Sequence, residues 1–213
     1  MPATRADAVR NRERILGVAR VVVREHGTQA SLRDIARRAE VGLGTLYRHF
    51  PTRDALLETL MRRRFDHLTS RAASLLAEDD AAAALTAWLT EFAYGAGTYS
   101  GLPDSIMATL RDDSSPLYAS CDAMRDAVGE LLAAAQAAGA IRADLRPEEL
   151  FALVTAVGWI AEQAPELEAR RERLLDLMLE GLRRPAAPAA PAAPAAPAAP
   201  AAPAAPAAPA RID

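Results

Sequence analysis

The sequence contains no lysine, one cysteine, three histidines, and aromatic residues at only 5% of its positions. The lone Cys121 excludes an intramolecular disulfide framework and any zinc site built from a cysteine cluster. No apolar run approaches the roughly 20 residues that span a bilayer. We therefore expect that this chain is not an integral membrane protein. The charged residues near Arg10 are not followed by an apolar segment typical of a signal peptide. We therefore expect a cytoplasmic location.

Sequence patterns for catalysis and metal binding are also missing. Residues 42–45 contain two glycines, but no strand precedes them and no Gly-Lys-Ser/Thr follows, as a phosphate-binding loop requires. His26, His49 and His67 lack the glutamate three residues earlier that a di-metal carboxylate bundle needs. Cys121 has no histidine nearby in the sequence, and a buried structural thiol is the simpler interpretation. We expect no enzyme, no metal site and no cofactor.

Residues 185–213 are a low-complexity tail, in which Pro-Ala-Ala repeats from Pro185 to Pro209. Proline at every third position removes backbone donors and clashes with the preceding turn, so this tail cannot be α-helical. The spacing suits a polyproline II rod instead. Two interpretations stay open: a stalk for a proline-binding partner, or a product of repetitive GC-rich codons without a role. The second is simpler, and under it removal of the tail leaves the folded part unaffected.

Charge divides unevenly along the chain. Residues 1–64 hold 14 arginines against seven acidic residues, a net charge of +7. Residues 65–184 hold ten arginines against 20 acidic residues, a net charge of −10. This asymmetry suggests a module that binds a polyanion, joined to a second module that does not.

Almost every segment before the tail has the periodicity of an amphipathic helix, and none alternates as a strand would. Ser31, with Asp34 three residues later, and Thr52 are typical helix caps. We predict an all-α protein of about nine helices, covering 10–26, two short helices within 31–50, 52–78, 81–97, 103–111, 116–138, 147–163 and 166–183.

Residues 31–50, SLRDIARRAEVGLGTLYRHF, read as two short helices around a three-residue turn. This is the pattern of a helix-turn-helix, whose second helix enters the major groove of DNA. On a helical wheel the apolar residues of the second helix face inward. The opposite face, where base edges would lie, carries Gly44, Thr45 and Arg48. An amphipathic hairpin with a solvated arginine face is the alternative.

Four further residues stand where they can contact DNA phosphates. Tyr47 and His49 flank the outward face of the second helix. Arg33 lies near the start of the preceding helix, and Arg53 lies at the start of the next. Contacts of this kind position a protein on DNA without reading its sequence, and helix N-termini assist them.

Residues 10–68 closely resemble the DNA-binding domain of the tetracycline-repressor (TetR) family. The resemblance rests on Ile15-Leu16, Ala19, Gly27, Ser31-Leu32-Arg33-Asp34-Ile35-Ala36, Val41, and above all Gly44-Thr45-Leu46-Tyr47-Arg48-His49-Phe50 followed by Leu56. It implies an all-α homodimeric transcription factor, usually a repressor, that leaves a palindromic operator in double-stranded DNA when a small apolar or aromatic effector binds. Residues 80–184, more loosely similar to the effector domain of one TetR subgroup, would bind that ligand and dimerise.

Three positions depart from the family pattern. Glu40 stands where the turn usually has glycine, and a side chain in the left-handed conformation costs about 1 kcal/mol. Gly42 replaces the usual serine or threonine cap of the second helix, a loss of a few tenths of a kcal/mol. Arg53 replaces the usual lysine and keeps its charge. The fine placement of the second helix depends on these positions.

Most aromatic residues fall in the C-terminal domain, among alanine and leucine. Each one alone is better explained as core, whereas together they suit a cavity for an apolar or flat ligand. The predicted ligand pocket comprises Phe65, Trp88, Phe92, Tyr99, Met107, Tyr118 and Trp159.

The last two predicted helices, 147–163 and 166–183, are expected to pair with their copies in a four-helix dimer interface. A ligand would shift the helix 52–78 and move the two DNA-reading helices out of register. The alternative is a constitutive dimeric DNA-binding protein without an effector, because the charge pattern and the motif are common to both. The predicted interface residues are Leu150, Val154, Val157, Leu174, Met178 and Leu182.

Overall fold

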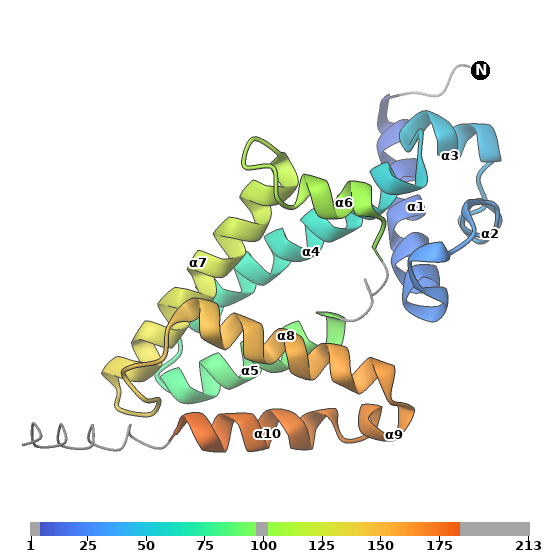
Figure 1. The fold of residues 1–213 in the computed structure, drawn as a ribbon. Coiled ribbons are helices and arrows are strands. Elements are labelled where there is room, and N and C mark those ends of the chain that lie inside the picture. Colours follow the sequence, from blue (N-terminus) through green and yellow to red (C-terminus); the bar gives the residue numbers. More distant parts are fainter. Residues whose placement is uncertain (1–4, 97–101, 184–213) are drawn as a thin grey trace, which may run out of the picture.

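The structure is a computed structural model that describes residues 5–96 and 102–183. These residues form ten α-helices and one 3-10 turn, without a strand, which confirms the predicted all-α class. No helix in these two ranges combines the length and apolarity that crossing a bilayer requires. Tyr99 and the tail 185–213 lie outside the described residues. The elements (Figure 1) are α1 Arg5–His26, η1 Gly27–Gln29, α2 Leu32–Arg38, α3 Leu43–His49, α4 Arg53–Leu75, α5 Ala81–Ala96, α6 Asp104–Thr109, α7 Pro116–Ala137, α8 Pro147–Gln163, α9 Pro165–Glu168 and α10 Arg171–Leu182.

Local chemistry sets several helix ends. Ser31, Thr52 and Ser115 each accept a hydrogen bond from the backbone N–H three residues later, which starts α2, α4 and α7. Gly27 (φ 69°) and Gly139 (φ 71°) adopt the left-handed conformation just after α1 and α7. Glycine takes this conformation without a steric penalty, so both residues end their helices.

Most predicted helices are observed within three residues of their expected ends, and two differ more from the structure. The first helix starts at Arg5 rather than at residue 10. The predicted helix 166–183 divides into α9 and α10, because Arg170 leaves the helical conformation (φ −107°, ψ 8°). This break puts Arg171 at the first position of α10, where its guanidinium lies 4.9 Å from the centre of the Tyr94 ring.

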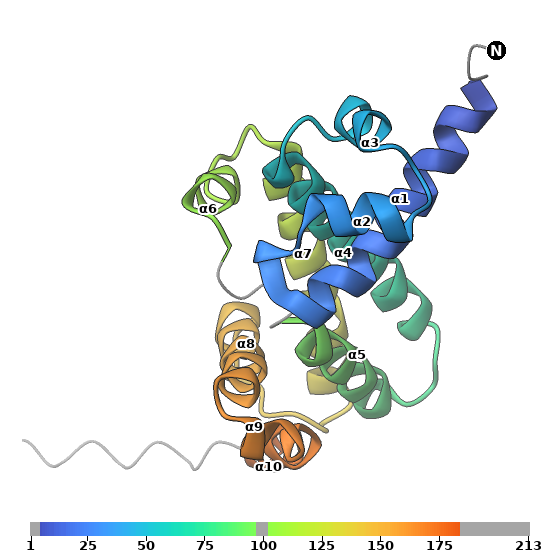
Figure 2. The ribbon, with the colours of Figure 1, turned by 90° about the vertical axis from the view of Figure 1, so that its right-hand side faces the viewer.

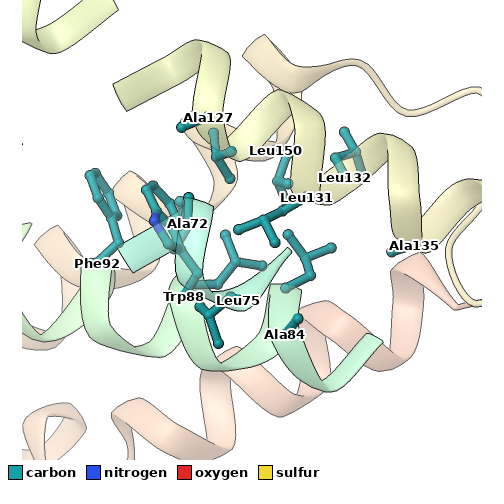
Figure 3. Close-up of a cluster of buried hydrophobic side chains, with 14 of the residues drawn as sticks. Ala72, Leu75, Ala84, Trp88, Phe92, Ala127, Leu131, Leu132, Ala135 and Leu150 are labelled. Carbon is teal, nitrogen blue, oxygen red and sulfur yellow. The ribbon is translucent and has the colours of Figure 1, made fainter. Parts of the chain in front are cut away.

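The helices enclose two hydrophobic cores. Helices α1, α2, α3 and the first half of α4 surround the N-terminal core, in which Leu46 and Phe50 are buried. The second half of α4 joins α5, α7, α8 and α10 around the C-terminal core. Figure 3 shows Trp88 and Phe92 of α5 in this core, near Leu131 of α7 and Leu150 of α8.

Helices α4, α6 and α7 connect the two cores. Helix α4 contributes buried residues to both, and Phe65 near its middle packs against each. Ile106 of α6 and Leu117 at the start of α7 belong to the N-terminal core, although they follow the C-terminal helix α5 in sequence. Helix α6 itself lies beside α4 (Figure 1). Helices α6 and α7 therefore pack in the same core that holds α3.

Candidate nucleic-acid interface

Helix α3 is fixed to the molecule by its apolar face. Leu46 is fully buried, Phe50 follows at 2% exposure, and Leu43 packs against the same core. The Arg12 guanidinium of α1 lies 5.4 Å from the centre of the Phe50 ring, which also holds the end of α3 against α1. The rest of α3 is thereby presented to solvent at one edge of the molecule (Figure 2).

The three predicted base-contacting residues share this outward face and contact one another. Gly44 and Arg48 are exposed, and Thr45 is half-buried. Arg48 donates a hydrogen bond from Nε to the Gly44 carbonyl oxygen at 3.3 Å, and another from Nη2 to Thr45 Oγ1 at 3.0 Å. The guanidinium therefore lies along the helix face in this structure. It has to swing outward to reach a base edge.

The turn between α2 and α3 contains a strained residue. Glu40 has φ 51°, the only positive φ of a non-glycine residue in the described chain. The sequence predicted a left-handed residue here, where the family usually has glycine. The side chain of Glu40 therefore costs about 1 kcal/mol of strain. Arg14 lies 4.0 Å from the Glu40 carboxylate. Gly42 is the N-cap of α3 and offers no side-chain hydrogen bond, so α3 starts without the usual capping oxygen.

Three of the four predicted phosphate-contacting residues line one hollow. The hollow has a volume of about 260 Å³, and Arg33, Tyr47 and Arg53 are in its wall together with Ser31, Leu32 and Leu43. Arg33 and Tyr47 are exposed, whereas Arg53 is half-buried. His49 does not line this hollow; its ring lies 6.4 Å from that of Phe50. The hollow thus brings together residues from α2, α3 and α4.

Arg53 has one hydrogen-bonded and one unpartnered nitrogen in its guanidinium group. Its Nη1 donates to Gln29 Oε1 at 2.9 Å, but its Nε is buried without a hydrogen-bond partner. Arg53 is also the first residue of α4, where the helix dipole disfavours a positive charge. An anionic oxygen in the hollow would balance the positive charge of Arg53 at this helix end. Sequence reasoning missed Gln29, which lies 24 residues away and carries no motif that marks it.

Ion pairs neutralise several acidic residues of the N-terminal helices. Arg37 donates a hydrogen bond to Asp34 at 2.5 Å, which lowers the pKa of that carboxyl, and Arg38 contacts Asp34 and Glu25. Among the described residues, no ion pair involves any of the arginines of the proposed interface. The surface around α3 therefore keeps a net positive charge, carried by Arg33, Arg48 and Arg53.

The structure brings together only some of the predicted ligand-pocket residues. The Trp88 and Phe92 rings stack at 5.4 Å within the C-terminal core, which Phe65 also contacts. Met107 and Tyr118 are half-buried on α6 and α7. Trp159 is 56% exposed and therefore lies apart from that core, while Tyr99 is outside the described residues. The ligand pocket stays a prediction, and of its seven residues Phe65, Trp88 and Phe92 lie together in the C-terminal core.

The predicted dimer-interface residues mostly face the chain's own core. Leu150 and Val154 are fully buried and Leu182 is 8% exposed, while Val157, Leu174 and Met178 are half-buried. Residues 150–161 are apolar on nearly every side, so the sequence could not show which stripe packs inward. Other apolar side chains of the same two helices are exposed, and sequence reasoning named none of them for the interface: Leu153, Trp159, Ile160 and Leu177.

Comparisons with known proteins match both halves of the chain. Residues 15–60 match the family described as bacterial regulatory proteins, tetR family, and residues 80–184 match the C-terminal domain of SbtR-like transcriptional regulators. Residues of this chain are 39% identical over 61 positions to the HTH-type transcriptional repressor KstR of Rhodococcus jostii (strain RHA1). That match spans 28% of this chain and only 29% of the length of the repressor.

Two solved structures extend the similarity over the whole fold. The TetR transcriptional regulator SCO0520 of Streptomyces coelicolor is 41% identical, with a TM-score of 0.65, over 81% of this chain and 98% of its own. The TetR transcription regulatory protein of Mycobacterium vanbaalenii is 34% identical, with a TM-score of 0.60, over 84% of this chain and 99% of its own. With its helix-turn-helix and its helical C-terminal domain, the chain belongs to the TetR family of transcriptional regulators.

Proposed function

We propose that this protein is a homodimeric repressor that binds a palindromic operator through α3. The observation that carries the proposal is the hollow beside α3, where the buried Arg53 Nε lacks a partner and Arg33 and Tyr47 converge. A backbone phosphate in this hollow accepts hydrogen bonds from the guanidinium groups that line it and places the outward face of α3 in the major groove. Similarity to a protein named as a repressor supports repression as the direction of control.

Base reading and phosphate contact fall to different residues. Gly44, Thr45 and Arg48 face the bases, and the arginine fork suits the O6 and N7 atoms of guanine. Arg33, Tyr47, His49 and Arg53 contact the backbone. In a dimer the two half-sites lie about 34–36 Å apart, or a multiple of this distance.

Footprinting of the DNA beside the gene, followed by binding to the protected duplex, tests this assignment. Arg48→Met should relax discrimination at one base position by about 1–3 kcal/mol. Arg33→Met is the matched control, because it removes the same charge from a phosphate-contacting position. It should weaken operator and random DNA equally. A protein that protects no palindrome, or an Arg48→Met variant with unchanged base preference, would contradict the proposal.

The dimer interface is proposed on the exposed side of α8 and α10. Leu153, Ile160 and Leu177 are 42%, 41% and 47% exposed, and Trp159 lies on the same helix as the first two. Large exposed apolar groups gathered on two helices are typical of an interface. Leu153→Glu should give a monomer in light scattering, whereas Leu76→Glu, at an exposed leucine of the α4 end, should leave the dimer intact. A dimeric Leu153→Glu variant would exclude this face.

Release by a small molecule is the finer part of the proposal. Ile106 and Leu117 pack in the N-terminal core, so a ligand that moves α6 or α7 changes the support of α3 directly. The ligand must bind the two arrangements with different affinities. The alternative is a constitutive DNA-binding dimer. A compound that raises the melting temperature and lowers operator affinity supports release, and a metabolite library without such a compound favours the alternative.

A further inference from the structure

A large groove lies away from the proposed DNA-binding hollow. It has a volume of about 1030 Å³ and is lined by residues of α1, α4, α5 and the α9–α10 segment. It shares no residue with the hollow beside α3, and none with the predicted aromatic pocket. Its wall contains five arginines against three glutamates.

The groove contains a buried cation with an unsatisfied donor. Arg171 is only 7% exposed, and its Nε is buried without a hydrogen-bond partner. Its guanidinium rests 4.9 Å from the centre of the Tyr94 ring, and Tyr94 is itself held by donating a hydrogen bond to Glu172 Oε1 at 2.7 Å. A buried donor without an acceptor is costly. The contact with Tyr94 keeps the guanidinium in place in spite of this cost.

The glutamates of the groove are mostly engaged by other cations. Arg63 donates two hydrogen bonds to the Glu13 carboxylate, at 2.6 and 2.5 Å. Glu91 contacts His67 at 2.7 Å and Arg71 at 3.7 Å. Glu168 is the third acidic residue of the wall.

Two further arginines of α1 complete the positive wall. Arg20 and Arg24 are exposed and, within the described part of the chain, take part in no ion pair. Leu16, Val23 and Leu60 add apolar surface between the charges. The groove therefore offers oxyanion-binding groups on both sides of a partly apolar floor.

We propose that this groove binds a small organic anion through a carboxylate or phosphate group, with Arg171 as its main donor. On binding, the Arg171 side chain turns so that its Nε, which is buried in the free protein, donates a hydrogen bond to the oxyanion. The charges of Arg20 and Arg24 attract the anion from the opposite wall. Charge-assisted hydrogen bonds to such groups are about twice as strong as neutral ones. Because the walls come from α1 and α10, the bound anion bridges the N-terminal helices to the C-terminal domain.

The Nε–H resonance of Arg171 in a proton–nitrogen NMR spectrum of the full chain provides the test. The probes are inorganic phosphate and hexanoate, each added at constant ionic strength against chloride. We expect at least one probe to shift this resonance to saturation, and the probe that succeeds identifies the headgroup. A shift of the Arg171 resonance that does not saturate, or that chloride reproduces, would overturn the proposal. A resonance that shifts with duplex DNA but with neither probe would overturn it as well.

Two single substitutions test whether Arg171 supplies the hydrogen bond to the bound anion. Arg171→Met should weaken binding of the successful probe, measured by calorimetry, at least about tenfold. Arg170→Met removes an exposed arginine of the adjacent position, which does not line the groove, and should leave the affinity unchanged. Equal affinity in both variants would show that Arg171 is not the donor. The wild-type titration stands even if Arg171→Met fails to fold, and none of these measurements depends on operator binding.

Discussion

Replacement of Arg53 by methionine should stabilise the free protein while weakening its binding to DNA. In the free structure, the buried Nε of Arg53 has no partner, and such a donor costs about 1–3 kcal/mol. Its charge at the first position of α4 costs a further 0.3–1 kcal/mol or so. The bond to Gln29 offsets about 0.5–1.5 kcal/mol. We therefore expect Arg53→Met to raise the free energy of unfolding by about 1 kcal/mol, or the melting temperature by roughly 2–4 °C.

On DNA we expect the sign to reverse, because a backbone phosphate is proposed to occupy the hollow. Arg53→Met removes one phosphate contact in each protomer, and each contact contributes about 0.9 to the slope of log affinity against log salt. The slope should fall by about one unit per protomer. Operator and random duplexes should lose affinity to the same extent, since the contact carries no sequence information.

Urea unfolding without DNA and fluorescence anisotropy over a range of salt concentrations measure the two effects. Arg71→Met is the matched control, because it removes the same charge about 27 Å farther along the same helix. It should leave the salt slope unchanged. The reasoning is refuted if Arg53→Met destabilises the free protein, or if it alters which operator bases matter.

Three further predictions concern stability. A Cβ on Gly95 would lie 2.0 Å from Cζ of Arg64, so Gly95→Ala should displace the hydrogen bonds of Arg64 and lower the unfolding free energy by about 1–2 kcal/mol. In an Arg64→Ala background the same substitution should be neutral or stabilising. Equal effects of Gly95→Ala in the two backgrounds, measured by urea melts, would contradict this. Glu40→Asn should raise the unfolding free energy by up to about 1 kcal/mol, because asparagine tolerates a positive φ; Glu40→Ala, which keeps the strain, should show no such gain. The hydrogen bond from Arg63 lowers the pKa of Glu13. At pH values above the usual glutamate pKa, near 4, this ion pair should stabilise the fold by less than about 1 kcal/mol. The stabilisation should be lost as the pH falls through the lowered pKa. Glu13→Gln should thus lower stability at neutral pH but not in acid, and a constant difference across urea melts would refute the link.

Local sequence patterns predicted the DNA-reading half well. Ser31 and Thr52 cap their helices as expected, Glu40 adopts the left-handed turn conformation, and Leu46 and Phe50 are buried. All of these depend on interactions within a few residues or on one helical period. Such interactions are encoded locally, so a single sequence is enough to detect them.

The C-terminal half was predicted less completely. Its helix positions followed from proline and apolar periodicity, but α8 is apolar nearly all round, and its wheel could not distinguish Leu150, which is buried, from Leu153, which is exposed. The exposure of Trp159 likewise follows from where α8 lies against its neighbours. An apolar pattern indicates that a residue can be buried. The packing of the other helices determines which of these apolar residues are buried.

The sequence by itself determined the all-α class, the helix-turn-helix and the separation of positive from negative charge, because each depends on residue type and short spacing. Only the tertiary structure placed Gln29 beside Arg53, and Tyr94 beside Arg171. These pairs are 24 and 77 residues apart in the chain. A buried donor without an acceptor exists only once distant segments have excluded water from it, so both orphaned arginine nitrogens are properties of the fold and not of any local motif.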